Sequence, residues 1–79
     1  MSQTLTLGYP VTLEGKTYSE LSVRRPKLID VMIADKQKTD YEKEVTLLSN
    51  LCGVAPNVIN EMDLKDYESL REIYASFKK

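Results

Sequence analysis

The sequence contains no histidine and only one cysteine among its 79 residues. Without histidine, a single copy of the chain lacks the base of Ser-His and Cys-His nucleophile pairs and the commonest ligand of protein zinc sites. The lone Cys52 cannot form an internal disulfide bond, and no basic cluster lies near it in sequence to activate its thiol. We interpret Cys52 as a packing residue. The sequence therefore predicts a protein that is not an enzyme, with no catalytic, cofactor-binding or metal-binding residues and no cofactor.

Long apolar runs are missing as well. The longest run covers residues 31–34, which is far shorter than the roughly 20 apolar residues of a membrane-spanning helix. The first dozen residues contain no Lys or Arg and no apolar stretch typical of a signal peptide. We therefore expect no membrane span, no secretory signal and a location in the cytoplasm.

Neither sign of charge dominates, because 11 basic and 12 acidic residues leave a net charge of −1. Residues 1–39 carry +2 and residues 40–79 carry −3. Neither half concentrates enough Lys and Arg to indicate nucleic-acid binding by charge alone. The length predicts a single domain over residues 1–79. A domain this small without a disulfide exposes much of its surface, so we expect it to associate with a partner or to form a homo-oligomer.

Residues 1–25 are predicted to form a β-hairpin. Apolar residues alternate with polar or β-branched ones in two runs, one before and one after Glu14-Gly15. Gly15 supplies the positive φ of a tight hairpin turn. Tyr9-Pro10 interrupts the first run, and because proline has no N–H to donate, we expect an edge, a bulge or a kink there.

Residues 26–79 are predicted to form the helical part. Pro26 suits the first position of a helix that ends near Lys36. This helix carries one apolar stripe, made of Leu28, Ile29, Met32 and Ile33. The Thr39-x-x-Glu42 spacing is a capping box that begins a second helix, and Gly53 ends it. The apolar face of the second helix comprises Tyr41, Val45, Leu48 and Cys52, widened by Leu47 and Leu51.

Two further helices complete the prediction. A short third helix is predicted within residues 54–62, opening at Pro56, and Asp63 caps a fourth. One side of the fourth helix is apolar, with Leu64, Tyr67, Leu70, Ile73, Tyr74 and Phe77. The predicted fold class is α+β, a small N-terminal β-hairpin followed by a bundle of three to four short helices.

The fourth helix also supplies the candidate partner-binding residues, which are Tyr67, Leu70, Tyr74 and Phe77. Their spacing of 3, 4 and 3 residues forms an apolar seam that is short for a self-sustaining coiled coil. We therefore assign the seam mainly to the core. Tyr74 and Phe77 lie nearest the chain end, and we expect them to protrude and contact a partner.

The sequence contains one acidic and one basic cluster: Glu61, Asp63 and Asp66, and Arg24, Arg25 and Lys27. The acidic cluster lacks the glycine turn and alternating ligands of a calcium loop, and helix capping and the helix dipole account for two of its members. The basic cluster fits a solvated strand end, or a contact with phosphate or an acidic partner.

Residues 49–54 resemble the turn of a helix-turn-helix, with Gly53 at the turn and Ile59 and Met62 as apolar anchors. A DNA-reading helix at this position would offer Asn57 and Asn60 but no Lys or Arg. We interpret the turn as structural and expect no nucleic-acid partner.

Together these motifs resemble those of the tail assembly chaperones of contractile-tailed bacteriophages of the P2 and Mu type, the E, 41 or 14 family. In chain order the motifs are Tyr9-Pro10-Val11, Glu14-Gly15-Lys16, Glu20-Leu21, Arg25-Pro26 with Asp30, residues 48–54, Pro56, Val58-Ile59, Met62-Asp63, Asp66-Tyr67 and Leu70. The resemblance implies a non-catalytic protein of the bacterial host cytoplasm. It also implies that the protein binds the tape measure protein, keeps it soluble during tail tube assembly and is absent from the mature virion. The alternatives are a small helix-turn-helix DNA-binding regulator and an unassigned protein-protein interaction domain.

Overall fold

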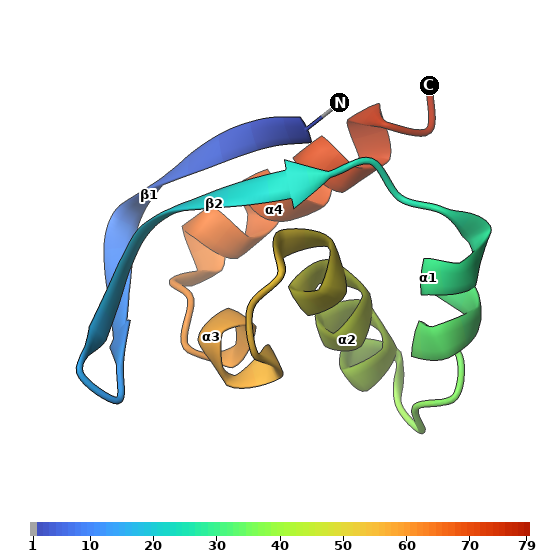
Figure 1. Cartoon of the computed structure of the whole chain (residues 1–79), viewed down its shortest axis with the longest axis horizontal. Helices are drawn as coiled ribbons and strands as arrows, with labels where there is room; N and C mark the ends of the chain where they lie inside the picture. The colour runs from blue at the N-terminus through green and yellow to red at the C-terminus, as the bar shows by residue number, and fades with distance from the viewer. Residues whose placement is uncertain (1) are drawn as a thin grey trace.

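A computed structural model describes residues 2–79 of the chain. The elements are β1 (Ser2–Leu13), β2 (Lys16–Arg24), α1 (Leu28–Ala34), α2 (Asp40–Cys52), α3 (Pro56–Asn60) and α4 (Leu64–Ser76). The predicted α+β fold, a hairpin followed by short helices, is confirmed. Figure 1 shows the hairpin curving over the helices, with α4 along it and α1 at the edge of the molecule beside α2. Among residues 2–79, no helix has both the length and the apolar character to cross a membrane.

The hairpin turn lies where the sequence predicts it. Strands β1 and β2 pair antiparallel from Ser2 opposite Arg24 to Leu13 opposite Lys16. Both residues of the turn have positive φ, 52° at Glu14 and 80° at Gly15, as in the two-residue turns whose twist matches that of paired strands.

The predicted irregularity at Tyr9-Pro10 is a shift of register between Thr6 and Val11. The shift leaves two backbone N–H groups of β1 without a partner in β2. The carboxylate of Asp66 in α4 accepts both, from Gly8 at 3.0 Å and from Tyr9 at 3.0 Å. Asp66 therefore joins the hairpin to the last helix.

The helix ends predicted by capping residues are confirmed. Glu42 N–H donates to Thr39 Oγ1 at 3.1 Å, and Thr39 N–H donates to Glu42 Oε1 at 3.0 Å, which completes the capping box of α2. Gly53 ends α2 with φ of 67°. Asp63 accepts from the N–H of Lys65 at the start of α4, and Pro56 is the first residue of α3.

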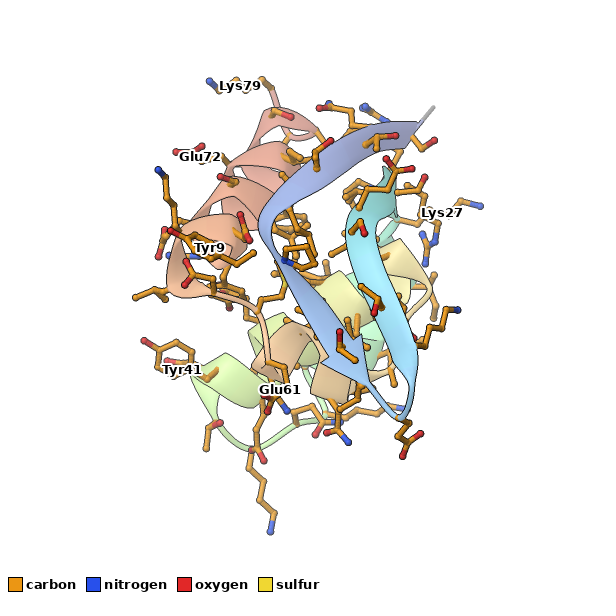
Figure 2. All side chains as sticks on the ribbon, turned by 90° about the vertical axis from the view of Figure 1, so that its left-hand side faces the viewer. Tyr9, Lys27, Tyr41, Glu61, Glu72 and Lys79 are labelled. Atoms are coloured by element: carbon orange, nitrogen blue, oxygen red, sulfur yellow. The ribbon has the colours of Figure 1, made fainter. Side chains whose placement is uncertain are left out.

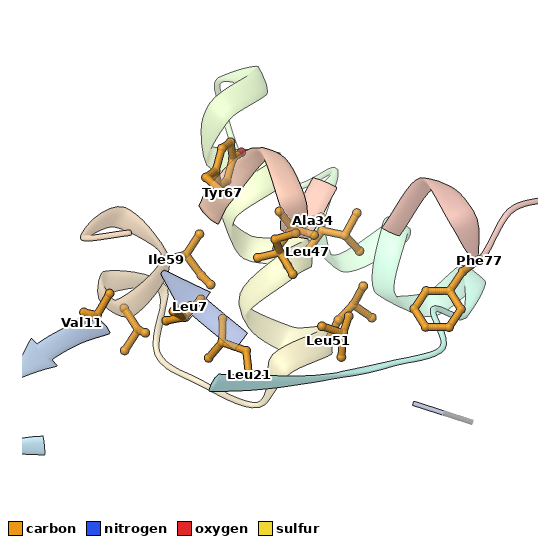
Figure 3. Packing of buried hydrophobic residues seen from close by; sticks show 13 residues of the cluster. Leu7, Val11, Leu21, Ala34, Leu47, Leu51, Ile59, Tyr67 and Phe77 are labelled. Atoms are coloured by element: carbon orange, nitrogen blue, oxygen red, sulfur yellow. The ribbon is translucent and has the colours of Figure 1, made fainter. Parts of the chain in front are cut away.

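The core lies between the inner face of the hairpin and α2, α3 and α4. Its most buried large side chains are Val23, Leu48, Leu51, Val58 and Leu70. Figure 3 shows residues from both strands and from the helices meeting in this cluster, with Phe77 at one end of it.

Three details of the helical prediction are wrong. Helix α1 begins at Leu28 with Lys27 as its N-cap, so Pro26 precedes the helix. Tyr41 and Leu64, both predicted on apolar inner faces, are among the most exposed large side chains. Both lie in the first turn of their helices, next to the N-cap. The first turn of each helix therefore lies at the edge of the core, where these side chains contact water. The predicted stripe of α1 is treated in the next subsection, since it too is exposed.

Candidate partner-binding surface

Helix α1 exposes its large apolar side chains and buries a charged one, the reverse of the usual arrangement in a small domain. Its five large apolar residues are between 41% and 75% exposed: Leu28, Ile29, Val31, Met32 and Ile33. Its buried residues are Asp30 and Ala34, one helical turn apart on a single face. The prediction of an apolar stripe is confirmed, but the stripe faces solvent. We call these five residues the α1 face.

An ion pair between a half-exposed arginine and a buried carboxylate holds α1 in this orientation. Arg24, at the end of β2, donates to both carboxylate oxygens of Asp30, at 2.9 and 2.7 Å. The backbone N–H of Lys27 donates to the same carboxylate at 2.8 Å. The hydrogen bonds from Arg24 hold the pKa of Asp30 below its usual value of 3.8, although burial opposes this shift. The paired carboxylate, rather than an aliphatic side chain, therefore occupies the inner side of the helix.

The other inward residue of α1 is small. Ala34 packs into the core, and Figure 3 shows it beside Leu47 of α2. Helix α1 packs chiefly against α2, and it contributes no large aliphatic side chain to the core. Apolar surface that a small domain would normally bury is left in contact with water.

A shallow hollow of about 260 Å³ continues the α1 face toward α4. Its apolar lining comprises Val31, Ala34, Leu47 and Tyr74, and its charged lining comprises Asp35, Asp40, Lys43 and Glu44. The hollow places Tyr74, one of the predicted partner-binding residues, next to the α1 face.

The four predicted partner-binding residues of α4 differ in accessibility. Tyr67 and Leu70 are buried, and the hydroxyl of Tyr67 donates to Glu44, so burial and this carboxylate raise the pKa of the phenol. Phe77 is only 8% exposed, and the Arg25 guanidinium lies 5.9 Å from its ring centre. The expectation that Phe77 protrudes is therefore wrong. Tyr74 is partly exposed, with Lys78 Nζ 4.6 Å from its ring centre. The binding role of the four residues stays a prediction, and Tyr74 is the accessible member.

The remaining candidates have structural environments. Cys52 is partly buried, and burial raises the pKa of its thiol to about 11, which keeps it protonated and unreactive at neutral pH. Asp63 caps α4 and Asp66 binds the hairpin. Across residues 2–79 there is no cluster of acidic and cysteine side chains that could hold a metal ion. In the basic cluster, Arg24 forms an ion pair with Asp30.

The length and the exposed residues of α3 argue against the helix-turn-helix alternative. Helix α3 is only five residues long, and its apolar side chains Val58 and Ile59 are buried. Asn57 and Asn60 are exposed, and α3 has no cation to contact phosphate. A helix that reads bases in a groove needs such donors along one accessible face. The α2–α3 turn therefore serves the packing of the domain.

The exposure of the α1 face does not follow from the periodicity of its sequence. Five of the seven residues in α1 are large and apolar, so periodicity could not distinguish an inner from an outer side. One signal was available: Asp30 is the only polar residue of the helix, and it follows Arg24 by six positions. A carboxylate with a nearby arginine can be buried as a pair, which turns the remaining faces outward.

The chain matches a family described as "Phage tail assembly chaperone proteins, E, or 41 or 14" over residues 4–79. No curated protein and no solved structure matches it.

Proposed function

This chain belongs to the family of phage tail assembly chaperones, and from that membership we propose that it binds the tape measure protein and keeps it soluble until the tail tube assembles. In this proposal the protein is not an enzyme, acts in the cytoplasm of the bacterial host and leaves before the virion matures. A tape measure protein exposes a long apolar helical surface until tube subunits cover it. Such a surface invites aggregation unless another protein masks it.

The observation that carries the proposal is the exposed α1 face. A helix that presents five large apolar side chains to solvent can pack against the apolar side of a partner helix. The hollow lined by Val31 and Tyr74 extends this surface. The binding role of the α4 residues enters the proposal through Tyr74, because Tyr67, Leu70 and Phe77 are buried and support α4 from within.

The small size of the α1 face suits reversible binding. At 1.5 Å per residue, the seven residues of α1 span about 10 Å, or two helical turns. A contact of that length buries a few side chains, each contributing roughly 1.5 to 3 kcal/mol. Such a contact releases its partner when tube subunits compete for the same surface.

Co-expression with the tape measure protein of the same phage tests the proposal. We expect the wild-type chain to keep the long protein in the soluble fraction and to co-purify with it. A double substitution, Leu28→Gln with Met32→Gln, should weaken binding by about two orders of magnitude, since it removes two apolar contacts. Both side chains are exposed in the free protein, so its melting temperature should stay nearly unchanged.

A matched control uses exposed apolar residues elsewhere. Figure 2 shows Tyr41 at the opposite side of the view from Lys27, the residue before α1. Tyr41→Gln with Leu64→Gln removes a similar exposed apolar surface and should leave tape measure binding intact. If the α1 double variant is folded and still solubilises the tape measure protein, the α1 face is not the binding surface. If the wild-type chain itself fails to keep the tape measure protein soluble, the proposed function is wrong.

A further inference from the structure

The segment around α1 differs in charge from the rest of the chain. Residues 24–38 contain five cations and two acids, a net charge of +3, whereas the remaining residues carry −4. The five cations are Arg24, Arg25, Lys27, Lys36 and Lys38. They lie before and after α1, so they bracket the α1 face at both ends.

Both acids of this segment are already paired. Asp30 is held by Arg24, and Asp35 lies 3.4 Å from Lys43 of α2. Within the described residues 2–79, no ion pair involves Arg25, Lys27, Lys36 or Lys38. The two ends of the α1 face therefore carry four cations that form no ion pair within residues 2–79, whereas Asp40 and Glu44 line the hollow toward α4.

The cations and the apolar residues share one surface. An open hollow at the end of β2 is lined by Ser2, Arg25, Pro26, Lys27, Ile29 of the α1 face and the paired Arg24 and Asp30. A ligand whose apolar side packs on Ile29 can thus place an acidic group beside Arg25 or Lys27. At the other end of α1, Lys36 and Lys38 are exposed and can pair with an acidic group of the same ligand.

We propose that the α1 face binds a helical segment of the partner that carries an apolar stripe flanked by Asp or Glu residues. This inference rests on the proposed function and specifies which segment of the tape measure protein is bound. Apolar contacts supply the affinity, and the acidic residues set the orientation and speed the encounter with the cations at the two ends of the α1 face. The two contacts together select acidic amphipathic helices over apolar segments in general.

Two other occupants of the surface are less compatible with its geometry. Interfacial membrane helices also combine apolar and basic residues, but Asp30 and Asp35 stand within or beside α1, and acidic groups oppose binding to anionic lipid. A second copy of this chain carries acidic residues, yet among residues 2–79 its large exposed apolar residues outside α1 are Tyr9, Tyr41 and Leu64, which do not form a continuous helical stripe. Both occupants are outcomes of the test.

Peptides of about 25 residues that tile the tape measure protein, long enough to form helices, provide the probe. Binding of each peptide to the full-length chain is measured by fluorescence anisotropy. We expect the peptides that bind to combine an apolar stripe with Asp or Glu at its edges. Lys36→Glu with Lys38→Glu should weaken their binding at least tenfold at about 50 mM salt, and the difference should shrink at about 500 mM salt because the charges are screened.

A matched control changes the same net charge away from α1. Lys16→Glu with Lys65→Glu alters the hairpin and the start of α4 and should leave peptide binding within about twofold, since screening limits long-range effects. Replacing the acidic residues of a bound peptide by Lys should restore binding to the Lys36→Glu, Lys38→Glu variant. Restoration of binding identifies direct charge pairing.

The outcomes separate this inference from the proposed function. If the Leu28→Gln, Met32→Gln variant loses the peptides but the charge reversal does not, the α1 face binds the tape measure protein without selecting acidic segments, and the inference is wrong. If no peptide binds and the chain instead binds vesicles of anionic lipid through α1, the inference is also wrong. Sedimentation that reveals a dimer abolished by the same charge reversal would assign the surface to a second copy and overturn it.

Discussion

At the scale of single residues, Asp66 connects two parts of the fold that are far apart in sequence. Its carboxylate accepts the N–H groups of Gly8 and Tyr9, which the irregular first strand leaves unpaired. An Asn at this position retains only one oxygen acceptor. We expect Asp66→Asn to lower the free energy of unfolding by about 1 to 2 kcal/mol, because a partly buried N–H loses its partner. Urea denaturation measures this loss.

Asp63→Asn is the matched control for this prediction. Asp63 accepts only one backbone N–H, from Lys65, and Asn is as good an N-cap as Asp. The control should therefore change stability by no more than a few tenths of a kcal/mol. Equal losses in the two variants would show that charge near the start of α4, rather than the contact with the hairpin, is what matters.

The Arg24–Asp30 pair makes stability depend on pH. The folded-state pKa of Asp30 is lowered by its hydrogen bonds with Arg24, so the stabilisation is fully present above its usual value of 3.8 and is lost as pH falls through the lower folded value. Arg24→Met removes two hydrogen bonds from the buried carboxylate, which keeps the one from Lys27 N–H, and should cost about 1 to 2 kcal/mol at pH 7 because Arg24 itself is half exposed. The cost should decrease below about pH 4, as Asp30 becomes protonated. Thermal unfolding from pH 7 to pH 3 measures this change, and a cost independent of pH would contradict it.

At the scale of elements, α2 depends on a backbone conformation at its end. Gly53 has φ of 67°, and no atom lies within 4 Å of where a Cβ would be. Substitutions there are strained by the backbone alone. We expect Gly53→Val to cost about 1 to 2 kcal/mol and Gly53→Asn less, because Asn adopts the left-handed conformation more readily. Chemical denaturation of both variants measures the difference, and equal stabilities of wild type and Gly53→Val would refute the assigned helix end.

Helix α1 shows how an element can be positioned by polar contacts. Seven residues are too few for a stable isolated helix in water. The Arg24–Asp30 pair, the capping contact at Lys27 and the packing of Ala34 hold it against the body of the protein. This arrangement leaves the α1 face largely exposed, because the ion pair, the cap and Ala34 do not use its large apolar side chains.

At the scale of the whole molecule, the exposed surface is larger than size alone predicts. The accessible surface is 5454 Å², against roughly 4900 Å² for a typical folded monomer of this mass. The radius of gyration of 11.9 Å is nevertheless close to the value of about 12 Å typical of a domain of this length. The extra surface thus accompanies a compact chain, in agreement with an exposed α1 and a curved hairpin (Figure 1).

The distribution of charge over the whole molecule also predicts what it does not bind. The net charge is −1, and α3 has no Lys or Arg. We expect no sequence-specific binding to duplex DNA, because phosphate contacts and base contacts both require donors that α3 lacks. Fluorescence anisotropy with labelled duplexes measures this, and salt-sensitive binding of one preferred sequence at micromolar concentration would contradict the prediction.

The sequence alone was sufficient for the local features of the fold. The turn at Glu14-Gly15, the capping box of Thr39 and Glu42, the end of α2 at Gly53 and the caps of α3 and α4 lie where predicted. Each depends on groups within a few residues of one another, so the residue types and their spacing determine it. The α+β class follows from the same local signals.

Tertiary structure decided which apolar surfaces are exposed to solvent. Phe77 was predicted to protrude, but it lies against Arg25, about 50 positions earlier in the chain. Asp66 accepts from Gly8 across 58 positions, and the burial of Asp30 in its pair with Arg24 turns the α1 face outward. The first two contacts depend on where distant segments of the chain meet, and the burial of Asp30 depends on whether its carboxylate can be paired away from water. The candidate binding surface therefore became visible only once the hairpin, α1 and α4 were placed in space.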